Sequence, residues 1–211
     1  TFVVLSIVLT LAIAVRAYRW MIARTSIVGA EVHGLALVRS PASTLAQGEL
    51  THVTRTPVEL EVAEAQWDGY VAALEAEGFA TLEIESSDEH PDSVFIEDTV
   101  VMLGQTAVIG SPGAESRRGE PDAVAAAVAD LGLDARHIRL PGTLDGGDVL
   151  KIGSTVYVGR GGRTNAEGIR QFRAIAGELG YTVVAVPVTK ALHLKSSVTA
   201  LPDGTVIGHP T

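Results

Sequence analysis

The sequence predicts an α/β fold built from a repeated unit of two strands, a helix and a third strand. Hairpin patterns alternate along the chain with amphipathic helical patterns, as is typical of mixed α/β proteins. Equivalent points of three hairpins, Val100, Val149 and Val198, follow one another at steps of 49 residues, a period that indicates a repeated supersecondary unit. Because such units bury their faces on neighbouring units, we expect a ring or stack.

The first unit begins with an apolar run at 34–38 that predicts a strand. A polar loop follows, and from Val62 the apolar residues within 67–74 recur at the spacing of one helix face, with Gly78 as the expected stop. Residues 81–84 predict the next strand. This unit therefore offers one strand before its helix, without a hairpin partner.

The second unit is more complete. Apolar runs at 99–103 and 106–109 predict a hairpin. Pro121 is a favoured first residue of a helix, and Gly132 is expected to end that helix before a strand at 137–140.

The third unit repeats this order. A hairpin is predicted at 149–152 and 155–158, then a helix that Thr164 caps and Gly180 ends, then a strand at 182–186.

A last hairpin at 197–200 and 205–207 has no helix after it. Together with the single strand of the first unit, this predicts that a segment beyond residue 211 pairs with that strand and closes the ring.

Composition restricts the function. The 211 residues include 16 Lys+Arg and 25 Asp+Glu, for a net charge of −9, which argues against a nucleic-acid-binding protein. With 46% hydrophobic and 19% charged residues, the chain has the composition of a packed globular protein. It contains no cysteine, which excludes disulfides and a thiol nucleophile within these residues.

The N-terminal segment has a different character. Residues 2–15 are apolar except for Ser6 and Thr10, and an aromatic and basic flank follows at 16–24. A membrane span needs about 20 such residues. We interpret residues 2–23 either as a truncated tether that places the rest of the chain in the cytoplasm, or as a segment unrelated to the remainder of the chain.

Polar residues collect just before the successive hairpins. They are Asp92, Glu97 and Asp98, then Asp145 and Asp148, then His193 and Ser196. In a ring of like units, these strand entrances converge on one pocket. Carboxylates accept the fixed N–H donors of a planar guanidinium in pairs, so such a pocket suits a delocalised organic cation. A metal ion is the alternative occupant.

Each of these residues also has a structural interpretation. Glu97 and Asp98 could face water at a strand edge. Asp145 could shape a glycine turn, and His193 could be a buried, hydrogen-bonded imidazole. Their shared position at one ring centre favours a common functional role.

Five strings carry a family resemblance. They are P-D-S-V-F-I-E-D at 91–98, P-G-A-E-S-R-R at 112–118, T-L-D-G-G-D-V-L at 143–150, R-T-N at 163–165 and H-L-K-S at 193–196. From about Leu35 to Thr211 the chain resembles the dimethylarginine dimethylaminohydrolases. F-I-E-D and H-L-K-S are the most specific strings, because arginine and agmatine deiminases typically differ at both places.

The resemblance implies a five-bladed α/β propeller, the pentein fold, of ββαβ units that is incomplete in this chain. Residues 1–30 would lie outside it, and residues 31–211 would form a partial catalytic domain. The implied activity is hydrolysis of N-omega-methylated arginine to citrulline and dimethylamine through a cysteine thiouronium intermediate. Since no cysteine is present, we expect the nucleophile beyond residue 211; an inactive polypeptide is the alternative.

The resemblance also implies residue roles. His193 would protonate the leaving amine and then activate water, Asp145 would orient the imidazole, and Glu97 would act beside them. The implied substrate-binding residues are Glu97 and Asp98 for the guanidinium, Asp92 for the α-amino group, Arg117 and Arg163 for the carboxylate, Leu50 on a lid loop, and Ser196. Both arginines could equally be ordinary surface charges.

No cofactor or metal is implied, and the expected partner is a methylated arginine. A homodimer is left open. Two other functions also remain: a deiminase or amidinotransferase that acts on unmethylated arginine, and an inactive module that binds cationic amino acids.

Overall fold

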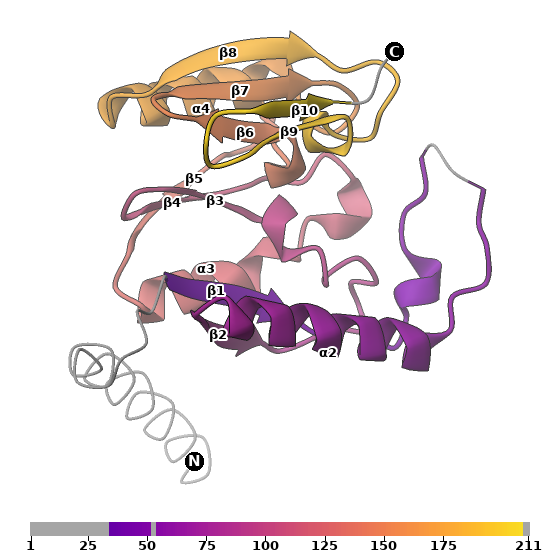
Figure 1. Cartoon of the computed structure of the whole chain (residues 1–211). Helices are drawn as coiled ribbons and strands as arrows, with labels where there is room; N and C mark the ends of the chain where they lie inside the picture. Colours follow the sequence, from indigo (N-terminus) through magenta and orange to yellow (C-terminus); the bar gives the residue numbers. More distant parts are fainter. Residues whose placement is uncertain (1–33, 52–53, 209–211) are drawn as a thin grey trace, which may run out of the picture.

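The computed structural model describes residues 34–51 and 54–208 (Figure 1). In these two stretches no helix has the length and apolar character that a bilayer crossing requires. The membrane tether predicted at residues 2–23 lies outside the described residues.

The described chain forms two full units and parts of two others. The first part contains β1 (Gly34–Arg39), α2 (Leu60–Ala76) and β2 (Phe79–Ile84). The next unit contains β3 (Val100–Leu103), β4 (Thr106–Ile109), α3 (Pro121–Asp130) and β5 (Asp134–His137). The following unit contains β6 (Val149–Ile152), β7 (Thr155–Arg160), α4 (Ala166–Glu178) and β8 (Thr182–Pro187). The last part contains β9 (Val198–Ala200) and β10 (Val206–Gly208).

Both full units have the same sheet topology. A hairpin forms an antiparallel pair, and the strand after the helix joins the second hairpin strand in parallel, which gives the orders β3-β4-β5 and β6-β7-β8. The parallel pair β1-β2 matches the last two strands of a unit, and the antiparallel pair β9-β10 matches the hairpin. The repeated unit that the sequence predicts is therefore confirmed.

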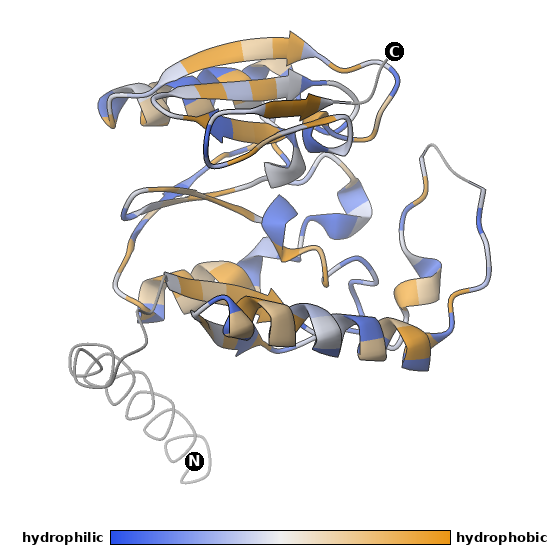
Figure 2. Ribbon diagram, viewed as in Figure 1, coloured by the Kyte–Doolittle hydropathy of each residue, from blue (hydrophilic) through white to orange (hydrophobic). Residues whose placement is uncertain are grey.

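The units stack from β1, β2 and α2 at one end to β6–β8 and α4 at the other (Figure 1). The main hydrophobic core joins the two full units, with Leu103 and Val108 from one and Val156 and Phe172 from the other. Phe172 on α4 is fully buried, and burying such a side chain contributes roughly 1.5–3 kcal/mol. Figure 2 shows the hydrophobic residues of β8 along most of its length. The packing of the two full units in this core fixes the starts of their hairpins relative to one another.

Two local predictions were wrong. The strand expected at 137–140 lies at Asp134–His137, because its parallel pairing with β4 ends where β4 ends, at Ile109 opposite His137. The cap of α4 is Asn165, whose side chain accepts a hydrogen bond from the Gly168 N–H, and not Thr164. The Thr164 hydroxyl instead accepts a hydrogen bond from the backbone of Asp145.

Candidate active site

Three short 3-10 turns occupy the same place in successive units, directly before the first strand of each hairpin. They are η3 (Ile96–Asp98), η5 (Gly146–Asp148) and η6 (Leu194–Ser196). Turn η5 contacts both η3 and η6. The entrances of three hairpins thus meet in one region, as the repeat predicts.

His193 is buried at this meeting point and faces two carboxylates. Its Nε2 lies 3.2 Å from Asp145 Oδ2, and its Nδ1 lies 3.8 Å from Asp98 Oδ1. Asp145 is fully buried, and its second oxygen accepts a hydrogen bond of 2.9 Å from the Gly113 N–H. Asp145 is therefore held on one side while it orients the imidazole on the other.

The surroundings of His193 favour its charged form. Burial is the largest single influence and lowers the pKa of His193, but the hydrogen bond to Asp145 and the charges of Asp98, Asp148 and Asp145 together raise that pKa above its ordinary value. A histidine of this kind carries a proton over a wider pH range than a free one. It is suited to donating that proton to a leaving group.

The glycines of L-D-G-G-D make the close approach of these turns possible. A Cβ on Gly147 would lie 2.5 Å from His193 Nδ1 and 2.7 Å from Asp98 Oδ1. A Cβ on Gly146 would lie 2.0 Å from the carbonyl oxygen of Glu97. The Gly147 N–H also donates to Asp98 Oδ1 at 2.9 Å. No other residue fits at either position without displacing the carboxylate, the imidazole or the Glu97 backbone.

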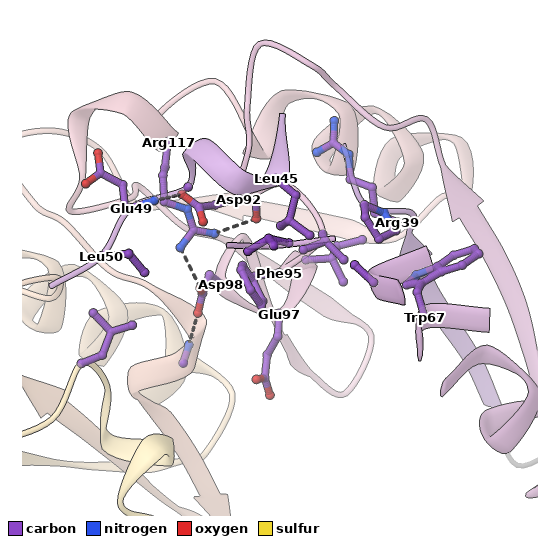
Figure 3. A pocket seen from close by; sticks show the side chains of 18 of the residues that line it. Arg39, Leu45, Glu49, Leu50, Trp67, Asp92, Phe95, Glu97, Asp98 and Arg117 are labelled. Atoms are coloured by element: carbon purple, nitrogen blue, oxygen red, sulfur yellow. Dashed lines mark hydrogen bonds and ion pairs between the residues drawn. The ribbon is translucent and has the colours of Figure 1, made fainter. Parts of the chain in front are cut away.

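Arg117 is buried between acidic groups (Figure 3). Its Nε and NH2 donate to Glu120 at 2.9 and 2.8 Å, and its NH1 donates to Asp98 at 2.9 Å. NH2 is also 3.4 Å from the carbonyl oxygen of Asp92. Every nitrogen of this guanidinium thus has a protein partner, and its charge is directed at Asp98.

A cavity of about 920 Å³ opens over this cluster, which is within the usual size range of small-molecule sites. Eight of the residues singled out in the sequence line it: Leu50, Asp92, Glu97, Asp98, Arg117, Arg163, His193 and Ser196. Asp145 lies behind His193 and does not line the cavity. In Figure 3, Leu50 and Trp67 stand on opposite sides of the cavity.

The segment that carries Leu50 is tied to two of these residues. The Glu49 N–H donates to Asp92 Oδ2 at 2.8 Å, and Arg163 NH2 donates to the Thr51 hydroxyl at 3.2 Å. Arg163 is buried, and its NH1 has no hydrogen-bond partner among the described residues. This NH1 atom is buried and lies 3.8 Å from Asp145 Oδ2, so the charge of Arg163 is placed beside the carboxylate that orients His193.

Two residues of the site were not assigned a role from sequence. Lys195 pairs with Glu97 at 2.6 Å between Nζ and Oε1, and Glu120 is 1% exposed and holds Arg117. Glu120 follows Arg117 by three residues, a spacing that permits a contact on a helical turn. The pairing of these two side chains was therefore predictable from the sequence. Lys195 follows His193 in H-L-K-S, but the partner of Lys195 lies on another unit.

The same cluster meets the geometric requirement of a cation site. Asp98, Asp145 and His193 offer ligand atoms within 4.8 Å of one another. Arg117 already pairs with Asp98, and Arg163 NH1 lies 3.8 Å from Asp145. A protein cation therefore already lies beside each of these two carboxylates.

Comparison with known proteins shows the family to which the chain belongs. The family model "N,N dimethylarginine dimethylhydrolase, eukaryotic" matches residues 51–201. A curated dimethylarginine dimethylaminohydrolase from Streptomyces coelicolor is 61% identical over 82% of this chain and 67% of its own length. The corresponding protein from Pseudomonas aeruginosa is 35% identical over 78% of this chain and 65% of its own length.

A solved structure of the Pseudomonas aeruginosa protein, in complex with citrulline, superimposes with a TM-score of 0.76 at 35% identity. The superposition covers 80% of this chain and 66% of the solved chain. The present chain thus spans about two thirds of the length of these relatives.

Proposed function

Because the chain belongs to the dimethylarginine dimethylaminohydrolase family, we propose that it forms part of an enzyme that hydrolyses N-omega-methylated arginine to citrulline and dimethylamine. The observation that carries the proposal is the convergence of Glu97, Asp98 and the His193–Asp145 pair, from three units, on one cavity. We also assign residues 31–211 to the catalytic part of the protein.

In this proposal the two carboxylates of η3 bind the guanidinium of the substrate. Asp98 is buried and fixed by Arg117 and the Gly147 N–H, whereas the Glu97 side chain is 70% exposed and points into the cavity, where Lys195 pairs with it. A planar guanidinium matches paired carboxylate acceptors. The substrate cation must displace Lys195 from Glu97, and the neutral product allows that pair to form again.

His193 supplies the proton chemistry. As the protonated imidazole beside Asp145, it donates a proton to the departing dimethylamine, and the neutral ring then takes a proton from the attacking water. The nucleophile in this proposal is a cysteine thiolate that attacks the guanidinium carbon. The 211 residues contain no cysteine, so we place that thiolate outside them.

The amino-acid end of the substrate binds at Asp92 and Arg163. The Asp92 carboxylate lines the cavity and would pair with the α-ammonium group, and the guanidinium of Arg163, which also lines the cavity, would hold the α-carboxylate. Arg117 has all three nitrogens engaged by Glu120, Asp98 and Asp92. We therefore assign Arg163 the larger part of carboxylate recognition, and Arg117 the alignment of Asp98.

We expect Arg163→Gln to raise the KM for dimethylarginine by roughly 10- to 150-fold, since a charge-assisted hydrogen bond contributes about 1.5–3 kcal/mol. The kcat should change much less, because Arg163 does not contact the reacting carbon in this proposal. Initial rates over a substrate series measure both constants. Arg160→Gln, at an exposed arginine, is the control, and equal KM values for the two variants would contradict the assignment.

The function itself is tested with the complete gene product, including any sequence that follows residue 211. Citrulline and dimethylamine should form from asymmetric dimethylarginine in equal amounts, and faster than citrulline forms from arginine. Preferential hydrolysis of arginine would indicate a deiminase. Binding of dimethylarginine without turnover would indicate an inactive module and contradict the proposal.

A further inference from the structure

A second aspartate of L-D-G-G-D, Asp148, is buried beside the active site without lining its cavity. It is the last residue of η5 and is 1% exposed. A buried carboxylate is costly unless it is hydrogen-bonded or paired. The contacts of Asp148 therefore indicate what its burial achieves.

Asp148 binds the residue that follows His193. Its Oδ1 accepts a hydrogen bond of 2.9 Å from the Leu194 N–H, at the point where η6 begins. The carbonyl of His193 in turn accepts from the Ser196 N–H at 3.2 Å. The backbone that follows the imidazole is thus fixed at two points, and one of the two constraints comes from another unit.

The neighbouring strand leaves room for this carboxylate. A Cβ on Gly159, in β7, would lie 2.4 Å from Asp148 Oδ1 and 3.0 Å from the Cβ of Leu194. Glycine inside a strand is ordinarily unfavourable and often marks a close approach. Here the missing side chain of Gly159 leaves room for both the Asp148 carboxylate and Leu194 of η6.

Asp148 also contributes to the charge around His193. The charged groups that face the imidazole are Asp98, Asp145 and Asp148, and the first two of these acids pair with Arg117 and Arg163 in turn. Burial is the largest influence on Asp148 and leaves its pKa raised overall, although the Thr164 hydroxyl, the Leu194 N–H and the charge of His193 act in the opposite direction. The charge of His193 thus favours the ionised carboxylate against the effect of burial, and the ionised carboxylate favours the protonated imidazole.

We propose that Asp148 is a positioning residue that holds His193 against Asp145 through the Leu194 N–H and adds a negative charge beside the backbone that carries the imidazole. The catalytic consequence rests on the proposed function; the effect on the imidazole does not. Asp148 acts through His193 and does not touch the substrate.

Two variants of the complete gene product separate the hydrogen bond from the charge. Asp148→Asn keeps an oxygen acceptor for Leu194 and removes the charge, whereas Asp148→Ala removes both. We expect Asp148→Ala to lower kcat by roughly 5- to 150-fold, the range for an unsatisfied buried donor, with KM within about threefold because the residue lies outside the cavity. At low pH, Asp148→Asn should retain most of the wild-type kcat. As pH rises, this variant should lose its activity at a lower pH than the wild type does.

Titration of the His193 ring by NMR gives a readout that does not depend on turnover. The midpoint should fall to lower pH in Asp148→Asn and stay unchanged in Asp68→Asn, a control at an exposed aspartate of α2. An unchanged midpoint in Asp148→Asn overturns the charge role. A wild-type kcat per folded molecule in Asp148→Ala overturns the positioning role and leaves only a structural one. If the wild type has no activity, the proposed function fails. The ring titration then still shows whether Asp148 affects the His193 imidazole.

Discussion

Replacement of His193 by asparagine is expected to lower kcat for dimethylarginine hydrolysis by about 10²- to 10⁴-fold, the usual contribution of a positioned acid–base group. Asparagine retains polarity but cannot donate a proton to the leaving amine or take one from water. His193 lines the cavity, and its Nε2 lies 3.2 Å from Asp145. Steady-state rates measure the loss, and His137→Asn, at an exposed histidine of β5, is the matched control. Full activity of His193→Asn would show that His193 is not the acid–base group of the reaction.

The pH dependence should follow the raised pKa of His193. Activity that needs the protonated ring is present at low pH and is lost as pH rises through the pKa of the folded protein, above the ordinary value of about 6.5. The stability that the charged ring contributes has the same sign, fully present below the pKa of the unfolded chain and lost as pH rises through that of the folded one. Asp145→Asn removes the negative charge of the acceptor whose hydrogen bond raises this pKa most, and should move the basic limb of the kcat profile to lower pH. If Asp145→Asn left the basic limb of the kcat profile unchanged, this result would contradict the assigned pairing of Asp145 with His193.

Removal of the Glu120 carboxylate is expected to have the largest effect on folding. The side chains of Arg117 and Glu120 are 5% and 1% exposed, with 2.8 Å between NH2 and Oε2. Glu120→Ala leaves the guanidinium buried and undercompensated, which typically lowers the free energy of unfolding by about 3–5 kcal/mol. Denaturant unfolding of the complete protein measures the change.

An exposed pair with the same sequence spacing provides the control. Arg118 and Glu115 are 3.0 Å apart, but their side chains are 38% and 87% exposed, so Glu115→Ala should cost at most about 1 kcal/mol. If both glutamate variants cost equally little, the buried pair does not anchor the fold.

The repeated unit was predictable because each unit carries its own local signals. Glycine turns between apolar runs identify the hairpins, and Pro121 marks the start of α3 at the residue expected. Strand β5 was placed too late because its residues are mostly polar and exposed, and its position is set by pairing with β4. Local hydrophobicity at 137–140 could not reveal that tertiary constraint.

The convergence of the site was predictable from the repeat, but the internal pairing was not. The equivalence of η3, η5 and η6 follows from position in the unit. Arg117 is engaged by Glu120 and Asp98, whereas Arg163 contacts Thr51 and Asp145. These pairings depend on side-chain directions that the sequence does not specify. The partner of Lys195 is likewise on a different unit.

A crystal structure of the complete protein with bound citrulline would show whether the entrances of the three hairpins form the substrate site. The ureido group of citrulline should lie within hydrogen-bond distance of Asp98 and next to His193, with the α-carboxylate at the Arg163 guanidinium and the α-ammonium group at Asp92. Citrulline bound elsewhere, or bound in this cavity with its amino-acid end at Asp98, would contradict the account.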